Sequence, residues 1–247
     1  SMVREICTEL GLDPHGYVIT GHPLSADGPR DANLAYTHTA IDRAARLGVR
    51  TVCLGLHPFA PRREGAPLWF WTDQSDDYRD VADRQSFLIT AFRELAGHAQ
   101  DAGVEISIEM YPGTAVGTAE RALRLIEAID HPAAGLNPDL GNLVRMQGPI
   151  EEWQDVVTEI LPFANYWHVK NYARAENPLT STVFTFPASL EDGVIDYRKA
   201  VRYALSVGFG GTFVTEHYGG DGIAVSARNR EYLRRLLASI LDEERLA

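Results

Sequence analysis

The chain alternates short strand-like runs with longer helix-like segments along almost its whole length, and this alternation restricts its fold more than any other feature. Apolar runs such as residues 49–54 are followed by segments with apolar residues at spacings of three and four. Strands that alternate with helices predict a parallel sheet covered by helices. With 247 residues, the chain has the length of one (β/α)8 barrel, which typically needs about 250. We therefore predict an α/β fold of the TIM-barrel type.

The expected elements follow one another without a change in composition that would mark a linker, so residues 1–247 are predicted to form a single domain. We expect strands at residues 17–20, 49–54, 104–108, 134–136, 165–169 and 212–215, a weaker strand at 184–187, and helices at 3–10, 34–47, 79–102, 119–129, 150–160, 197–207 and 227–241. A complete barrel needs a further strand before the first helix. That strand is missing or truncated, so the predicted barrel has two sheet edges that a loop or a partner chain would cover.

The charge balance argues against nucleic acid as a partner. The 23 basic and 34 acidic residues give a net charge of −11, which repels a phosphate backbone. Cys7 and Cys53 lack a CxxC spacing and are expected to be reduced, buried thiols. No run reaches the roughly 18 apolar residues of a membrane-spanning helix, so we expect a cytoplasmic protein with no membrane partner. His38 and His98 fall on predicted helix faces and are expected to be solvated.

Four acidic or imidazole side chains stand at the ends of four predicted strands. Glu109 follows VEISI, Asp139 follows AAGLNP, His168 follows FANYW and Glu216 follows TFVT. All strands of an α/β barrel direct their carboxyl ends toward one face, so these side chains should converge there. Three carboxylates and one imidazole suit a hard or borderline divalent cation. The sequence therefore predicts a metal site at the mouth of the barrel.

Four segments carry a resemblance to a known family. In order and spacing, IEMYPGT, NPDLGN, YWHVKNY and VTEHYGG resemble the metal-binding strand ends of the xylose isomerase-like TIM-barrel family of sugar isomerases and epimerases. The resemblance covers about residue 5 to the C-terminus. It implies that Glu109, Asp139, His168 and Glu216 bind one divalent ion such as Mn, Mg or Co.

Two positions depart from that family's pattern. The family often has a histidine three residues after its aspartate and an aspartate three residues after its histidine, where this chain has Asn142 and Asn171. The four metal ligands are intact, but the polar groups around them differ, so the exact substrate stays open.

The same residues allow a proton to be removed next to a carbonyl. A metal ion that chelates vicinal oxygens of a sugar, polyol or hydroxy-ketone acts as a Lewis acid and stabilises the enediolate. Glu109 and Glu216, on what would be the fourth and eighth strands of a full barrel, are the candidate bases and are expected to face each other across it. One would remove a proton from one face of the substrate while the other returns a proton to the opposite face. This arrangement predicts a sugar isomerase or epimerase.

Other reactions fit the same residues. The enolate could also expel a β-substituent, so a lyase or dehydratase, or the subunit of a C-glycoside-cleaving complex, stays open. An endonuclease IV-like phosphodiesterase resembles the same barrel but uses more histidines and three zinc ions. The net negative charge and Asn142, which stands where a further histidine would be needed, argue against this last alternative.

Five further residues are candidate substrate contacts. His22 and His57 each follow a predicted strand and would bind sugar hydroxyls, or equally cap their own loops. Lys170 shares a strand face with the predicted ligand two positions earlier and would bind an oxyanion. Trp69 and Trp71 lie in an aromatic loop, and exposed aromatic clusters usually mark a binding surface. That loop would stack on a sugar or contact a second copy or a partner subunit.

Overall fold

Six parallel strands form the wall of the barrel. The computed structural model describes residues 2–24, 29–57, 78 and 82–246. One parallel sheet contains, in spatial order, β1 (Gly16–Ile19), β2 (Thr51–Gly55), β3 (Glu105–Glu109) and β4 (Ala134–Asn137). A second parallel pair consists of β5 (Tyr166–Val169) and β8 (Thr212–Thr215). A bridge between Leu136 and Ala164 connects β4 to the segment that enters β5, so the six strands follow one another around the wall.

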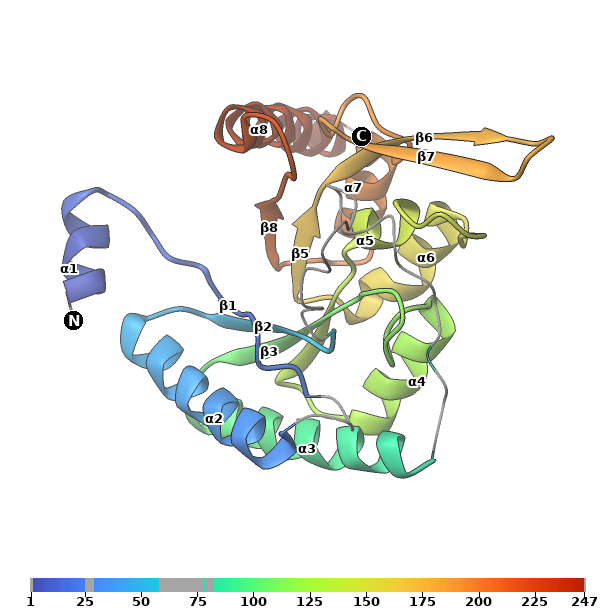
Figure 1. Cartoon of the computed structure of the whole chain (residues 1–247). Helices are drawn as coiled ribbons and strands as arrows, with labels where there is room; N and C mark the ends of the chain where they lie inside the picture. The colour runs from blue at the N-terminus through green and yellow to red at the C-terminus, as the bar shows by residue number, and fades with distance from the viewer. Residues whose placement is uncertain (1, 25–28, 58–77, 79–81, 247) are drawn as a thin grey trace.

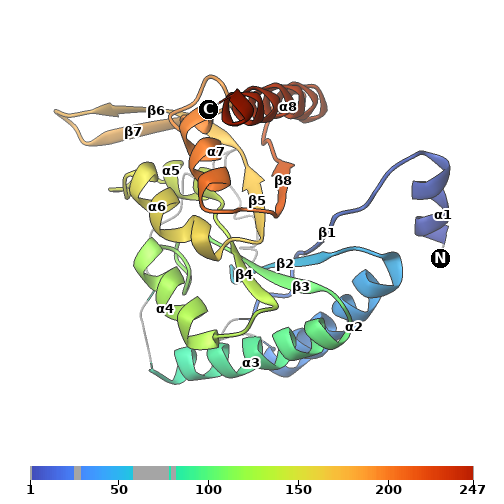
Figure 2. The same ribbon diagram turned by 180° about the vertical axis from the view of Figure 1, so that it is seen from behind.

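Helix α1 (Met2–Glu9) precedes the first strand, has no buried residue and lies apart from the sheet in Figure 1. The other helices follow strands along the chain. They are α2 (Arg30–Leu47), α3 (Ala82–Asp101), α4 (Ala119–Ile129), α5 (Leu140–Val144), α6 (Trp153–Ile160), the 3-10 helix η2 (Leu161–Phe163), α7 (Tyr197–Ser206) and α8 (Gly222–Leu246). Figure 1 shows α2 and α3 side by side below the four-stranded sheet, and Figure 2 shows the same arrangement from behind. None of the described helices is long and apolar enough to cross a membrane.

Local sequence signals account for several of these boundaries. Helix α2 ends at Gly48, which adopts a left-handed φ of 76°. Glycine is favoured there because a Cβ atom makes this conformation costly. Helix α4 begins after Thr118, whose hydroxyl accepts a hydrogen bond from the backbone N–H of Arg121, as expected for an N-cap. These two helices begin or end within a few residues of the predicted positions because their capping residues are visible in the sequence.

The predicted barrel fold is confirmed, and all six clearly predicted strands are present within two residues of their expected ends. The largest boundary error is in α8, which extends five residues beyond the prediction at each end. Three of the described elements were not predicted: the short helix α5, the 3-10 helix η2 and the strand β6 (Asn171–Asn177). Within the described ranges, no strand precedes α1 and no ladder joins β8 to β1.

The prediction of a seventh barrel strand at residues 184–187 was wrong. These residues belong to β7 (Thr182–Ala188), which pairs antiparallel with β6. The two strands are connected by residues 178–181, whereas a parallel crossover requires a dozen residues or more. They therefore form a hairpin, which projects from the barrel in Figure 1.

The β5–β8 pair is packed against a buried aromatic cluster. Trp167 is fully buried, and its ring lies within 6.1 Å, centroid to centroid, of the rings of Tyr197, Phe209 and Phe213. Aromatic side chains bury a large apolar area. This cluster therefore fixes the strand that carries His168 against the strand that precedes Glu216.

Gly211 is a position where the β5–β8 pair leaves no room for a side chain. A Cβ atom there would lie 2.2 Å from the backbone oxygen of Asn165, whereas one at Gly210 would meet nothing closer than 4.0 Å. We expect Gly211→Ala to lower the free energy of unfolding by about 1–3 kcal/mol, the usual cost of overpacking, because a backbone atom cannot rotate away. Urea denaturation measures this cost, with Gly210→Ala as the matched control. Equal losses in the two variants would contradict the close approach of the strands.

Candidate metal centre

The barrel brings the four predicted metal-binding residues together. Glu109 is the last residue of β3, Asp139 is the N-cap of α5 two residues after β4, His168 lies in β5, and Glu216 directly follows β8. Each offers one ligand atom, and these atoms all lie within 4.8 Å of one another. The parallel strands place the four side chains at the same end of the barrel, where barrel enzymes build their sites.

His168 stands at the centre of the group. Its Nδ1 atom lies 3.5 Å from Glu109 Oε1, 3.7 Å from Asp139 Oδ2 and 3.7 Å from Glu216 Oε2. Within the described part of the chain, His168 Nδ1 is buried and makes no hydrogen bond. A buried imidazole nitrogen surrounded by three carboxylates is the arrangement in which a cation satisfies all four groups. The residues present therefore fit a divalent metal ion.

The charges in this group depend strongly on one another. Burial opposes the ionised form of Glu109, but the adjacent His168 outweighs it and lowers the pKa of Glu109 to about 2. Burial also opposes the charged form of His168, but Asp139 and Glu109 raise the pKa of this imidazole to about 10. Without an ion, protonated His168 thus offsets part of the carboxylate charge.

Lys170 supplies a second positive charge to the same carboxylates. Its side chain is buried, and its Nζ lies 2.9 Å from Asp139 Oδ2 and 2.7 Å from Glu216 Oε2. Burial alone would lower the pKa of Lys170, but these two carboxylates raise it above its usual value. Lys170 directly follows β5, two positions after His168, and it contacts two of the candidate ligands directly.

Asparagines position two of the ligands from outside the group. Asn137 Oδ1 accepts a hydrogen bond of 2.7 Å from the backbone N–H of His168. Asn142 donates through Nδ2 to Glu109 Oε1 at 3.1 Å, so this departure from the family pattern still holds a ligand. Neither role was predicted, because the partners are 31 and 33 residues away along the chain.

Asn171, the second departure from the family's pattern, is bonded to the loop that leads into α7. Its Nδ2 donates to the backbone oxygens of Leu190 and Ile195, and its Oδ1 accepts from the backbone N–H of Ile195. These bonds order the loop that leads into α7. Asn171 therefore stabilises the rim of the barrel through backbone contacts.

The candidate substrate contacts lie in different surroundings. The ring of His57 stacks on Tyr111 with centroids 3.8 Å apart, and burial lowers the pKa of His57 although Glu109 opposes the shift. His22 stacks on Tyr36 at 3.7 Å, and its Nδ1 lies 3.3 Å from Asn33 Oδ1. The charges of Glu109 and Asp139 therefore act on the imidazole of His57.

Trp69 and Trp71 lie outside the described residues, so their proposed contacts with a sugar stay a prediction.

A buried arginine near the group was missed by the sequence analysis. Arg145, at the end of α5, is fully buried, and its guanidinium lies 5.2 Å from the centre of the Tyr111 ring and 5.7 Å from that of Tyr218. The ammonium of Lys170 lies 4.8 Å from the same Tyr218 ring. Arg145 follows Asp139 by six positions, but no local pattern distinguishes it from a solvated residue at a helix end.

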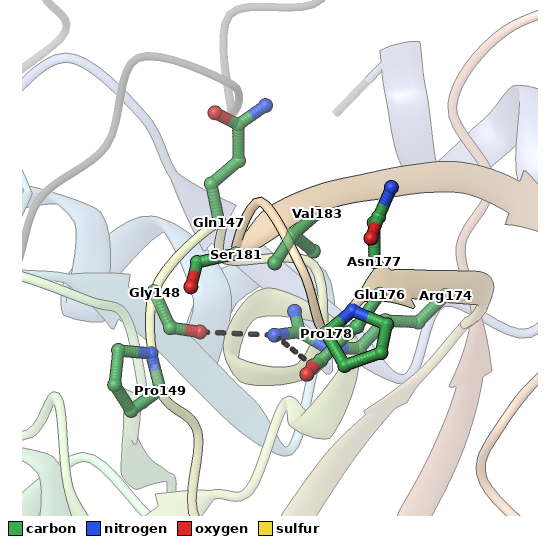
Figure 3. A pocket seen from close by; sticks show the side chains of 9 residues that line it. All are labelled: Gln147, Gly148, Pro149, Arg174, Glu176, Asn177, Pro178, Ser181 and Val183. Carbon is green, nitrogen blue, oxygen red and sulfur yellow. Dashed lines mark hydrogen bonds and ion pairs between the residues drawn. The ribbon is translucent and has the colours of Figure 1, made fainter.

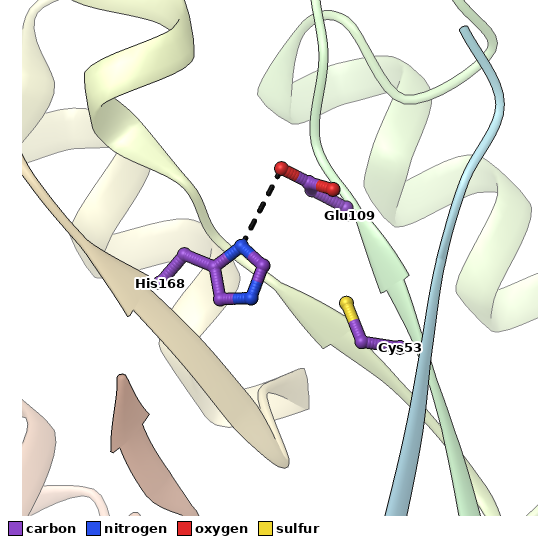
Figure 4. A group of neighbouring side chains, drawn as sticks. All are labelled: Cys53, Glu109 and His168. Carbon is purple, nitrogen blue, oxygen red and sulfur yellow. Dashed lines mark ion pairs between the residues drawn. The ribbon is translucent and has the colours of Figure 1, made fainter. Parts of the chain in front are cut away.

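Cys53 offers an alternative third ligand beside Glu109 and His168, and Figure 4 shows the three side chains together. Burial, followed by the charge of Glu109, raises the pKa of this thiol well above its usual value. Because the thiolate is the form that binds metals, the carboxylates are the better ligands. Both cysteines are free, as predicted, but Cys7 is only partly buried.

A cavity of about 330 Å³ lies apart from these residues, between the β6–β7 hairpin and residues 147–149 (Figure 3). Arg174 lines it and donates to the backbone oxygens of Val144, Met146 and Gly148. The same guanidinium pairs with Glu176. None of the four candidate metal ligands lines this cavity, so we do not assign it to the metal centre.

The fold and the site together define a TIM-barrel protein with a candidate metal centre at the carboxyl ends of its strands. A family model described as xylose isomerase-like TIM barrel matches residues 2–236. The chain therefore belongs to the xylose isomerase-like TIM-barrel family. A search of curated proteins found no match.

Solved structures of this fold include metal complexes and sugar enzymes. A xylose isomerase-like TIM barrel protein from Mycobacterium smegmatis, solved in complex with magnesium, is 36% identical, with 96% of this chain and 77% of that chain covered and a TM-score of 0.90. Mannonate dehydratase from Streptococcus suis is 14% identical, with 98% and 81% covered and a TM-score of 0.75. The 3-keto-D-glucoside 4-epimerase from E. coli is 14% identical, with 94% and 83% covered and a TM-score of 0.66. The last two similarities concern the fold alone.

Proposed function

We propose that this protein is a divalent-metal-dependent isomerase or epimerase that acts on a ketose, polyol or related hydroxy-ketone. Its metal ligands are Glu109, Asp139, His168 and Glu216. The observation that carries this proposal is the approach of their four ligand atoms to within 4.8 Å of one another. Three carboxylates and one imidazole favour Mn, Mg or Co, and a relative 36% identical to this chain was solved with magnesium.

The reaction requires a proton to move at the carbon next to a carbonyl. When bound, the ion polarises that carbonyl and makes the neighbouring C–H bond more acidic. Glu109, held by Asn142 at 3.1 Å, and Glu216, held by Lys170 at 2.7 Å, enter the site from different strands. One carboxylate removes the proton and the other returns a proton. Return to the opposite face of the same carbon inverts that carbon, whereas return to the other carbon of the enediolate moves the carbonyl.

Other side chains bind and orient the substrate. Lys170 keeps Glu216 in place and adds positive charge where an oxyanion develops. His57 binds a substrate hydroxyl, and burial lowers the pKa of its imidazole, which favours the neutral ring. His22 binds a second hydroxyl, and the loop of Trp69 and Trp71 stacks on the sugar.

Exchange of substrate hydrogen with solvent tests this function directly. Ketoses incubated in D2O with the protein and Mn or Mg are expected to gain deuterium next to the carbonyl, and chelation of the metal should stop the exchange. Glu216→Gln should slow exchange by about 10²- to 10⁴-fold, the usual contribution of a general base. Mass spectrometry and NMR measure the label, and the exposed Glu231→Gln is the matched control.

Two results would contradict the proposed reaction. The absence of metal-dependent exchange with every ketose of a broad panel would exclude proton transfer at this carbon. Loss of water from the substrate without a labelled isomer would instead assign the same residues to a dehydratase.

A further inference from the structure

Two histidines face each other on the outside of the barrel, where α2 and α3 lie side by side in both Figures 1 and 2. His38 is on α2 and His98 is on α3, and their Nδ1 atoms are 2.7 Å apart. The ring centroids are 4.9 Å apart. This separation is close to the distance between the two nitrogens plus the radius of each ring, so the two Nδ1 atoms point at each other. The sequence predicted both residues as separate, solvated side chains.

Each ring is held from its other side by a carboxylate on the opposite helix. His38 Nε2 lies 2.8 Å from Glu94 Oε1 on α3, and His98 Nε2 lies 3.0 Å from Asp42 Oδ1 on α2. Histidine and carboxylate are four residues apart on both helices, which places them one turn apart on the same face. The four side chains therefore brace the two helices in a crossed arrangement.

These contacts determine where the ring protons are. An ionised carboxylate can only accept a hydrogen bond, so both Nε2 atoms are donors. A neutral imidazole with its proton on Nε2 has a lone pair on Nδ1, and here two such lone pairs would face each other at 2.7 Å. A metal ion, or a proton shared by the two rings, would remove this repulsion.

We propose that His38 and His98 form a second metal site, which binds one borderline divalent ion such as zinc, nickel or copper. A carboxylate that receives the far N–H of a metal-binding histidine is the usual partner of such ligands, because it fixes the tautomer and the ring orientation. Glu94 and Asp42 provide that partner on both sides of the pair. Imidazole nitrogens select these ions over the harder Mg and Mn.

The pair needs only a small adjustment to hold zinc. Zinc binds imidazole nitrogen at about 2.0–2.1 Å with tetrahedral geometry, so the two Nδ1 atoms would separate to about 3.3 Å. Both side chains are 29% exposed, which leaves the ion a route from solvent and lets water complete its coordination. The site binds zinc in exchange for the proton that the two rings share.

Zinc binding to the full-length chain tests this site. In a background with Asp139→Asn and Glu216→Gln, we expect equilibrium dialysis to find one zinc ion per chain that His38→Ala and His98→Ala both abolish. All variants keep Cys53, Glu109 and His168, so any ion bound there would be present in each of them. The zinc content that is lost on substitution of His38 or His98 therefore reports on the histidine pair alone. Asp42→Asn should weaken zinc binding by about 10- to 100-fold.

The control and a second readout separate a metal site from a structural pair. His15 also pairs with a carboxylate, at 3.2 Å from Asp13, but among the described residues it has no ring contact with a second imidazole, so His15→Ala should keep the zinc. Zinc should also raise the melting temperature of the background protein by more than that of the His38→Ala variant. If the His38→Ala and His98→Ala variants bind as much zinc as the background protein, the pair shares a proton and does not bind a metal ion.

Discussion

Replacing Asp139 by Asn together with Glu216 by Gln is expected to reduce the metal content of the purified protein from about one ion per chain to none. The two substitutions remove two of the three carboxylates whose oxygens lie within 3.7 Å of His168 Nδ1. Even the outer partners of metal ligands contribute about 10- to 100-fold to affinity, so the loss of two direct ligands should exceed 100-fold. Elemental analysis after dialysis against Mn or Mg measures this change.

A matched pair of substitutions controls for the loss of negative charge. Asp101→Asn and Glu231→Gln change the same residue types at exposed positions and should leave the metal content unchanged. Thermal unfolding gives a second readout, because an ion at 100 times its Kd stabilises the folded state by about 2.7 kcal/mol. An ion that survives in the double variant, with a normal melting shift, would place the metal elsewhere.

Replacing Lys170 by Met is expected to destabilise the metal-free protein by about 3 kcal/mol. The ammonium lies within 2.9 Å of both Asp139 and Glu216, and removing one partner of a buried ion pair costs about 3–5 kcal/mol. We expect the lower end because the Glu216 side chain is 27% exposed and water screens it. Methionine keeps most of the volume of the lysine stem, so the main loss is the charge.

Metal ions should reverse much of this effect, because a divalent ion supplies the positive charge that the carboxylates have lost. Chemical denaturation with and without Mn measures both states. The control is Lys199→Met, whose ammonium is 75% exposed beside Asp196 and whose ion pair is worth at most about 1 kcal/mol. An equal loss of stability with saturating metal would indicate that Lys170 acts through packing alone.

The convergence of the four candidate metal ligands is the part of the site that could be predicted from the sequence. Each of its members stands at or just after the end of a strand, and in a parallel barrel that position alone directs the side chains to one face. No contact distance was needed, since convergence follows from the topology. The resemblance to the xylose isomerase-like family named the same four residues, and the match of a family model to residues 2–236 supports that resemblance.

The β6–β7 hairpin could not be predicted in the same way. A run of strand-forming residues near Phe184 was assigned to the barrel because its local pattern is that of any strand. Whether it pairs in parallel or antiparallel depends on the four-residue connection after Asn177 and on the neighbour available at that edge. The periodicity of the apolar residues predicts a strand, but it does not predict the neighbour or the direction in which that strand pairs.

The sequence by itself determined the order of strands and helices, the helix ends marked by Gly48 and Thr118, and the four residues at the strand ends. These features depend on local conformation and on chain topology, which short segments encode. Only the tertiary structure decided that Lys170 pairs with two of the candidate ligands, that Asn142 holds Glu109, and that His38 meets His98. Those contacts join residues 31 to 60 positions apart, and side-chain orientation across such distances is determined by packing, which no local pattern records.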